Sequence, residues 1–256
     1  MSHSWSPEQY LRFGDERGRP FVELTARIGA ESPHRVVDLG AGPGTLTALL
    51  AARWPEAEVI AVDSSPEMVE RARTVPEISA RLEDLTAWEP SAPVDVLVTN
   101  AALQWVPGHL DLLPHLVRQV APGGWFALQV PGNFDEPSHA LRRDLAAEEP
   151  YAAHTRDVAV PAAHDAATYL RALQELGCTV DAWETTYLHV LTGEDPVFTW
   201  VSGTGARPTL QALPDDLRPA FEQEFRARLR AAYPADADGR VVLPFRRVFA
   251  VAQTRA

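Results

Sequence analysis

Lysine is missing from this 256-residue chain, so all 23 basic residues are arginines. Any site that binds an anion must therefore use guanidinium groups, which hold a carboxylate or phosphate through two parallel hydrogen bonds. A phosphate-binding loop that ends in Gly-Lys-Ser/Thr is excluded, because it needs a lysine.

Cysteine is almost as scarce. The single Cys178 excludes an internal disulfide and a multi-cysteine metal site, and it fits a reducing compartment. The eight histidines are not spaced with acids as metal ligands are, so we predict no metal. No apolar run approaches the roughly 18 residues of a membrane-spanning helix, and the first 20 residues lack the apolar core of a signal peptide. We therefore expect a cytoplasmic protein.

Positive charge is also in deficit, since the formal net charge is −12. A field of this sign repels nucleic acids and anionic membranes, so we expect neither as a partner. The expected partner is a small molecule, and the oligomeric state stays open.

Apolar segments alternate with helical ones up to Asn133. The segments "RVVDLG", "EVIAVD", "VDVLVTN" and "GWFALQV" are apolar on both faces, which is typical of buried parallel strands. Ser65 and Pro66 mark a helix start, and "APGG" at 121–124 predicts a turn before the fifth strand. These features predict an α/β fold, a Rossmann-like doubly wound sheet.

The pattern changes after Asn133, where helical stretches dominate. We predict helices over 137–148, 165–176 and 214–232, and two further strands over 180–191 and 245–253. The sheet is then seven-stranded and mostly parallel. The chain 1–256 is predicted to be one domain, with N-terminal helices within 1–29 over the active site and a helical cap insertion within 134–240.

The most specific segment is "VVDLGAGPGTL", Val36 to Leu46. Its glycines are Gly40, Gly42 and Gly44. A dinucleotide-binding fingerprint needs a third glycine at position 45, where this chain has a threonine. The acid Asp38 at the strand end disfavours a pyrophosphate and favours a ligand that carries an ammonium or sulfonium group. Glycines let the backbone approach that ligand closely.

Two further acids follow strands. Asp63 ends "EVIAVD", where a carboxylate can accept hydrogen bonds from both hydroxyls of a ribose. Asp84 in "LEDL" lies after a short third strand, within reach of an adenine amino group. Surface acids at strand ends are the alternative for both.

Taken together, "VVDLGAGPG", "VIAVDSSPEM", "RLEDL" and "VLVTNAALQWV" resemble motifs I to IV of the class I S-adenosylmethionine-dependent methyltransferases, over about residues 35–130. The resemblance implies that the cofactor is S-adenosyl-L-methionine. It also implies which residues contact each part of the cofactor. The methionine moiety is contacted by Asp38, Gly40, Gly42 and Gly44, and the ribose by Asp63, Ser64 and Met68. The adenine is flanked by Asp84 and Leu85, and the sulfonium lies near Asn100 and Gln104.

A narrower resemblance covers almost the whole chain. The segments "WSPEQYLRFGDERGRP", "NAALQWVPGHLDLLPHL", "LGCTVDAWETTYLHVL", "WVSGTGARP" and "RRVFAVA" resemble the trans-aconitate 2-methyltransferase family. This resemblance implies an enzyme that forms a monomethyl ester of a tricarboxylate. Carboxylates are ionised at pH 7, so the acceptor is its own nucleophile. We therefore name no catalytic acid or base.

A tricarboxylate needs cationic clamps, because a chain with net charge −12 otherwise repels it. We select Arg17, Arg19, Arg207 and Arg247 as substrate-binding candidates, with Arg246 as the alternative to Arg247. Arg207 lies in "SGTGARP", where the glycines and Pro208 predict a loop. Surface ion pairing with Asp15 or Glu16 is the alternative for Arg17 and Arg19.

Aromatic side chains are expected to complete the acceptor pocket. Trp105 directly follows the fourth strand, where acceptors bind in this fold, and Tyr10 and Tyr187 fall in the resembling segments. Packing in the core is the alternative for each.

Three other functions stay open. The first is a methyltransferase for another small acid, a phenol or an amine. The second is a cofactor-binding scaffold without turnover. The third is a nicotinamide dehydrogenase, which Thr45 and Asp38 disfavour.

Overall fold

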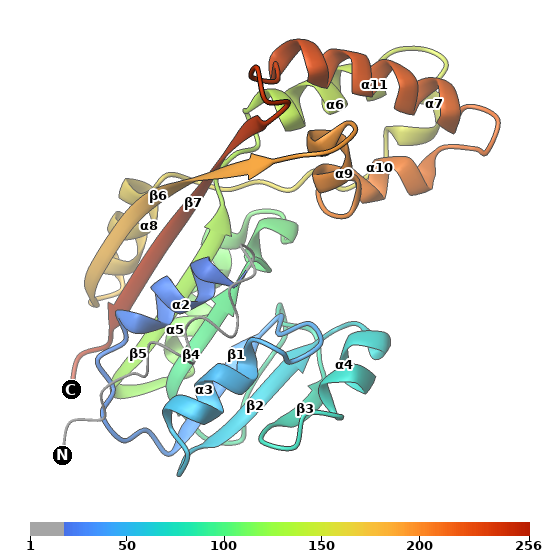
Figure 1. Cartoon of the computed structure of the whole chain (residues 1–256). Coiled ribbons are helices and arrows are strands. Elements are labelled where there is room, and N and C mark those ends of the chain that lie inside the picture. The colour runs from blue at the N-terminus through green and yellow to red at the C-terminus, as the bar shows by residue number, and fades with distance from the viewer. Residues whose placement is uncertain (1–17) are drawn as a thin grey trace. The chain divides into compact units, whose positions relative to one another are not determined.

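The computed structural model describes residues 18–256, which form two compact units (Figure 1). The first unit comprises described residues up to Val130, then His164–Glu184 and Arg247–Ala256. The second comprises Pro131–Ala163 and Thr185–Arg246. Of the region 1–29 that was predicted to form N-terminal helices, residues 1–17 lie outside the described residues. Helix 165–176 and the first part of strand 180–191 belong to the first unit, although they fall within the predicted cap region 134–240.

One seven-stranded sheet has the order β3-β2-β1-β4-β5-β7-β6 (Figure 1). Its strands are β1 (Arg35–Leu39), β2 (Glu58–Asp63), β3 (Ser79–Leu82), β4 (Val94–Asn100), β5 (Val120–Pro131), β6 (Thr179–Leu191) and β7 (Val241–Gln253). The predicted Rossmann-like, seven-stranded fold is confirmed.

The first five strands are parallel, and β7 is antiparallel to β5. The parallel pairs are β1 with β2 and β4, β2 with β3, and β4 with β5. Backbone hydrogen bonds join Gly124 to Thr254 and Gly132 to Arg246, so residue numbers rise along β5 as they fall along β7. The central strands are apolar because both faces are covered: Val36 and Val37 of β1 are fully buried.

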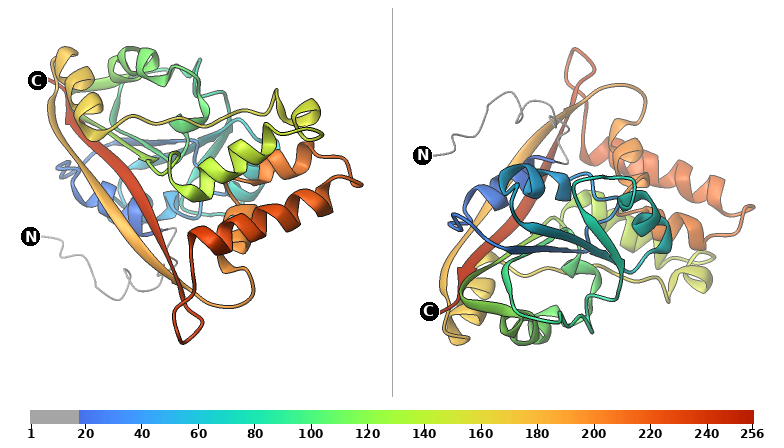
Figure 2. Two further views of the ribbon diagram at one scale, coloured as in Figure 1. Left: turned by 90° about the horizontal axis from the view of Figure 1, so that it is seen from above. Right: turned by 90° about the horizontal axis from the view of Figure 1, so that it is seen from below.

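The helices of the first unit cover both faces of its sheet. They are α2 (Arg19–Ala26), α3 (Thr47–Arg53), α4 (Pro66–Ala72), α5 (Leu113–Arg118) and α8 (Ala166–Glu175), with the short 3₁₀ helices η1 (Leu103–Trp105) and η2 (His109–Leu112). Figure 2 shows α2 and α3 on one face and α5 and α8 on the other. Helix α4 begins as predicted, with Ser65 as N-cap, Pro66 in the first turn and the Ser65 side chain accepting from Met68 N.

The predicted turn at 121–124 is wrong, because β5 already begins at Val120. The pairing of β4 with β5 shifts register between Val94 and Val96, which marks a bulge rather than a turn. Gly123 has φ 75°, and a Cβ on Gly124 would lie 2.9 Å from the carbonyl oxygen of Asp95. Gly123 and Gly124 therefore let β5 run, with a distorted backbone, through the segment where the sequence predicted a turn.

The second unit is built on five helices and the adjoining parts of β6 and β7. The helices are α6 (Pro137–Ala146), α7 (Ala152–Thr155), α9 (Pro196–Ser202), α10 (Arg207–Ala212) and α11 (Arg218–Ala232). Its core is apolar and aromatic, with Phe221, Phe225 and Leu243 fully buried. Helix α11 begins at Arg218, four residues after the predicted start, and α7, α9 and α10 were not predicted.

Candidate active site

The glycine turn leaves the carboxyl end of β1 and lies against the ends of β2 and β4. The amide N–H groups of Gly40 and Ala41 both donate to Val62 O, at 2.8 and 3.0 Å. A Cβ on Gly40 would lie 2.3 Å from the Cβ of Ala102, which follows β4. The carboxyl ends of three parallel strands thus meet at this turn, where open α/β sheets bind their ligands.

The three glycines of the turn all have positive φ, but they face different surroundings. Gly40 and Gly44 both have φ 76°, and Gly42 has φ 58°. A Cβ on Gly44 would lie 2.7 Å from the Ile78 side chain, whereas a Cβ on Gly42 would meet no atom of residues 18–256 within 4 Å. Gly40 and Gly44 are therefore needed for packing, while the space beside Gly42 is open to a ligand.

Asp38 is a buried carboxyl group under this turn. It is 2% exposed, and its Oδ2 accepts a hydrogen bond of 2.7 Å from the Thr47 hydroxyl. Burial raises the pKa of Asp38 to about 7; the Thr47 bond lowers it in part, and the nearby Asp63 carboxylate raises it further. A cationic ligand would stabilise the ionised form.

Asp63 ends β2 and is held by two backbone groups. Its Oδ2 accepts from Gly42 N and its Oδ1 from Ser65 N, both at 2.8 Å. A carboxylate has about four acceptor positions, so each oxygen can accept one more hydrogen bond. Beside it, Ser64 is exposed and Met68 is half-buried.

Asp84 and Leu85 follow β3. Asp84 is exposed, and its Oδ1 accepts 2.8 Å hydrogen bonds from both the amide and the hydroxyl of Thr86. The backbone bond from Thr86, followed by its side-chain bond, lowers the pKa of Asp84. Leu85 is half-buried. One oxygen of Asp84 is thus used within the turn, and Oδ2 accepts no hydrogen bond from the described residues.

The end of β4 carries amide side chains. Gln104 is 5% exposed, and its Nε2 donates to Ala101 O at 2.5 Å. Asn100 Oδ1 and Gln104 Oε1 are buried without a hydrogen-bond partner within residues 18–256. Such an atom costs about 1–3 kcal/mol, so the arrangement suits a site completed by a ligand. Trp105 follows on η1 and is 42% exposed.

Strand register places the acids and Asn100 on one face of the sheet. Asp38 is aligned with Ala61 on β2 and with Val98 on β4. Aligned residues on neighbouring strands point to the same face, as do residues two apart on one strand. Asp63 and Asn100 therefore share the face of Asp38.

Gln129 extends this row and was missed in the sequence interpretation. It is aligned with Asn100 and is 1% exposed. Within the described chain, neither its Nε2 nor its Oε1 has a hydrogen-bond partner. One signal was present: it is the only polar residue in the apolar stretch "WFALQV".

The substrate-binding candidates are only partly described. Tyr10 and Arg17 lie outside the described residues. In the first unit Arg19 is exposed, and Arg247 on β7 is half-buried. Arg246 is also half-buried.

The remaining two candidates belong to the second unit. The predicted loop at Arg207 is wrong: this residue begins α10, with Pro208 in the first turn, where the missing proline N–H costs no hydrogen bond. Arg207 is exposed. Tyr187 is 5% exposed, and its ring stacks on His189 with centroids 6.4 Å apart.

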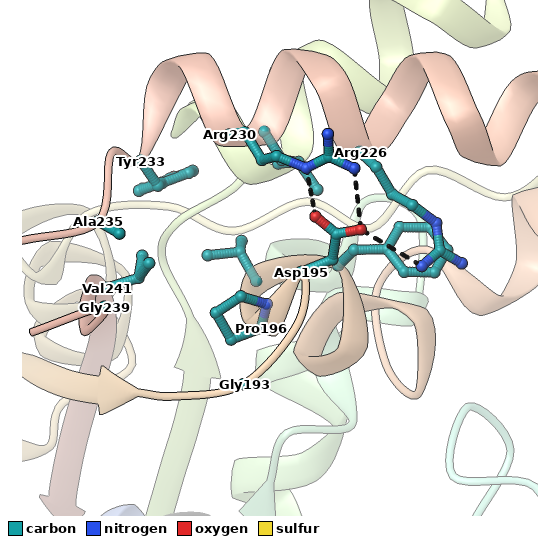
Figure 3. A pocket seen from close by; sticks show the side chains of 12 residues that line it. Gly193, Asp195, Pro196, Arg226, Arg230, Tyr233, Ala235, Gly239 and Val241 are labelled. Carbon is teal, nitrogen blue, oxygen red and sulfur yellow. Dashed lines mark hydrogen bonds and ion pairs between the residues drawn. The ribbon is translucent and has the colours of Figure 1, made fainter.

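A cavity of about 270 Å³ lies within the second unit (Figure 3). The Asp195 carboxylate accepts from Arg230 Nε at 2.5 Å and lies 3.7 Å from Arg226 Nη1. Figure 3 shows these three side chains joined at the cavity. The two arginines are thus already paired with an acid, and none of the predicted site residues lines this cavity.

Within 18–256, no group of three histidine, cysteine, aspartate or glutamate side chains could hold a metal ion. No helix in this part of the chain is long and apolar enough to cross a membrane.

Comparisons with known proteins agree with this geometry. A family model described as a methyltransferase domain matches residues 10–182. The trans-aconitate 2-methyltransferase of Mycobacterium sp. (strain KMS) is 50% identical over 253 residues, which cover 98% of this chain and 99% of that protein. That of Rhodococcus jostii (strain RHA1) is 50% identical over 254 residues, covering 98% and 100%. The solved structure of the YcgJ protein from Bacillus subtilis has a TM-score of 0.62 at 16% identity, covering 93% of this chain and 99% of that one.

The fold, the glycine turn with its acids, and the matching family model define a class I S-adenosylmethionine-dependent methyltransferase. Within that class, the chain belongs to the trans-aconitate 2-methyltransferase family.

Proposed function

We propose that this enzyme esterifies one carboxylate of trans-aconitate with a methyl group from S-adenosylmethionine. The observation that carries the proposal is the 50% identity to trans-aconitate 2-methyltransferases, which extends over 98% of this chain and so includes regions outside the cofactor motifs. A fold likeness alone would leave the acceptor open.

The chemistry of the residues at the strand ends supports the cofactor contacts that the family resemblance implies. Asp38 and the glycine turn, with Gly42 open to a ligand, would hold the cationic methionine end. Asp63, fixed by Gly42 N and Ser65 N, would accept from the ribose hydroxyls, beside Ser64 and Met68. Further proposed contacts are Asp84 and Leu85 with adenine, and Asn100 and Gln104 near the sulfonium.

The bound cofactor supplies an electrophilic methyl group on a sulfonium. The acceptor carboxylate is ionised at neutral pH, so no side chain has to remove a proton. The protein's contribution is to align the two groups and exclude water, which in favourable systems is worth about 7–11 kcal/mol.

The acceptor's negative charge requires cations and a shaped pocket. Arg17, Arg19 and Arg247 are the proposed guanidinium partners, and Trp105 and Tyr10 the proposed aromatic walls. For Arg207 and Tyr187, which belong to the second unit, substrate binding stays a prediction from the sequence. Arg247 is half-buried, where a charge-assisted bond is less screened than at the exposed Arg19 and Arg207.

A labelled-methyl assay with a panel of di- and tricarboxylates, phenols and amines tests the proposal, with the product ester located by NMR. We expect a single monomethyl ester of trans-aconitate and no methylated phenol or amine. If another acid is methylated faster than trans-aconitate, the substrate proposed here is wrong. Cofactor binding by calorimetry without any product would favour a non-catalytic scaffold.

A further inference from the structure

Gln129 on β5 carries a buried side-chain amide that makes no hydrogen bond within residues 18–256. Its residue is 1% exposed, and both Nε2 and Oε1 lack a hydrogen-bond partner in the described part of the protein. Gln253 on β7 provides a contrast, because its Nε2 donates to Gly123 O at 3.1 Å. Folding removes water from the Gln129 amide, and no group of the described residues replaces those hydrogen bonds, an arrangement expected when a ligand completes the bonding.

Gln129 lies beside the residues that we assign to the cofactor. It is aligned with Asn100, whose Oδ1 also lacks a described partner, and both point to the face that carries Asp38 and Asp63. Gln129 on β5 therefore lies beside Asn100 on β4, the residue that we propose lies near the sulfonium. A ligand that occupies this position in the first unit would adjoin the reacting end of the cofactor.

The register of β7 places a cation on the same face. The hydrogen bonds of Gly124 with Thr254 and of Gly132 with Arg246 align Phe249 with Gln129. Arg247 precedes Phe249 by two residues and so points to the face of Gln129. A neutral donor on β5 and a guanidinium on β7 thus share one face of the sheet, as an acceptor with several carboxylates requires.

We propose that the Gln129 amide donates a hydrogen bond from Nε2 to the acceptor carboxylate that receives the methyl group. This inference rests on the proposed function. A guanidinium at that position would place a second cation beside the sulfonium and would draw electron density from the attacking oxygen. A neutral amide orients the reacting carboxylate without either effect. In this arrangement the arginines bind only the carboxylates that do not react.

Gln129→Met tests the assignment, because it keeps the length and apolar volume of the side chain while it removes both polar atoms. We expect kcat to fall by about tenfold or more, since alignment of the reacting group is lost. The acceptor KM and the cofactor Kd should change less than about threefold, because the arginines and the cofactor site are untouched. NMR of the product should show a mixture of monomethyl esters in place of one.

Thermal unfolding of the ligand-free variant separates this role from a structural one. Removing unsatisfied buried polar atoms should raise the Tm of Gln129→Met by roughly 2–4 °C. The control Gln253→Met removes an amide that is already bonded, so it should lower the Tm slightly and leave kcat and the product ester unchanged. If Gln129 had only a structural role, the Gln129→Met variant would instead have a lower Tm than the wild type.

Gln129→Glu provides a second test that does not depend on the methionine variant. Its carboxylate should repel the acceptor at pH 8, and activity should recover toward pH 5 as the substituted carboxyl becomes protonated and regains a donor. The assignment is overturned if both variants keep the wild-type kcat and ester, or if the cofactor Kd rises instead. Failure of the wild type to esterify any tricarboxylate would overturn the proposed function as well.

Discussion

At the scale of single residues, burial and hydrogen bonding set the chemistry of the site. Asp38 and Asp63 are both acids at strand ends, yet their surroundings differ. Asp63 accepts two backbone hydrogen bonds, whereas Asp38 has one hydroxyl partner and is 2% exposed. The two carboxyl groups are therefore suited to different parts of one ligand, Asp63 to hydroxyl donors and Asp38 to a cation.

Asp38 should make the ligand-free protein less stable as the pH rises. Its folded pKa of about 7 lies above the ordinary aspartate pKa of 3.8, so the folded state binds more protons than the unfolded state between these values. Stability is therefore lost as pH rises through about 4 to 7. Urea unfolding of Asp38→Asn between pH 5 and 8 should show a flatter dependence than the wild type, together with weaker cofactor binding.

Thr47→Val is the matched control, because the Thr47 hydroxyl lowers the pKa of Asp38. It should move the loss of stability to higher pH. Identical pH profiles for all three proteins would mean that Asp38 does not titrate in this range.

At the scale of elements, the glycine turn combines a packing role with a ligand-binding role. Gly40 lies so close to Ala102 that a Cβ cannot fit, while Gly42 borders open space. Both positions have positive φ, which alone costs an alanine about 1 kcal/mol. The additional steric cost therefore belongs to Gly40 alone.

Gly40→Ala and Gly42→Ala should separate these roles. We expect Gly40→Ala to lower the free energy of unfolding by more than about 2 kcal/mol, because the backbone after β4 must move. Gly42→Ala should cost about 1 kcal/mol and should weaken cofactor binding more than its stability loss explains. Chemical denaturation and calorimetry measure the two effects; equal destabilisation by both substitutions would contradict the contrast.

Elements were predicted well where local signals agree and less well where tertiary contacts decide. The Ser65-Pro66 start of α4 is confirmed because capping is a local interaction. The loop prediction at Arg207 was wrong because glycine and proline also occur at helix starts, and here Leu210 of α10 packs into the core of the second unit. The turn at 121–124 was wrong because pairing with β4 keeps the segment extended.

At the scale of the whole molecule, charge sets the approach of the acceptor. A chain with a net charge of −12 repels a trianion at long range, whereas guanidinium groups attract it only on contact. Added salt weakens the long-range repulsion more than the attraction by nearby guanidinium groups, because the Debye length falls from about 30 Å at 0.01 M to about 10 Å at 0.1 M salt.

The value of kcat/KM for trans-aconitate should therefore rise by roughly two- to fivefold as ionic strength increases from 0.01 to 0.1 M. Steady-state kinetics at constant pH measure this. Methylation of a diester analogue, which keeps one ionised carboxylate as the nucleophile and loses two charges, should depend less on ionic strength. A steady fall with salt would instead indicate that a cationic entrance steers the acceptor.

The sequence by itself determined the class of fold and the cofactor chemistry, because apolar periodicity, the glycines of the turn and the acids at strand ends are local features. Only the tertiary structure decided which distant residues share a face. Gln129 adjoins Asn100 because β5 pairs with β4 in one register, and Arg247 points to that face because β7 pairs with β5 in another. Register is set by side chains packed across strands, so no single strand's sequence contains it.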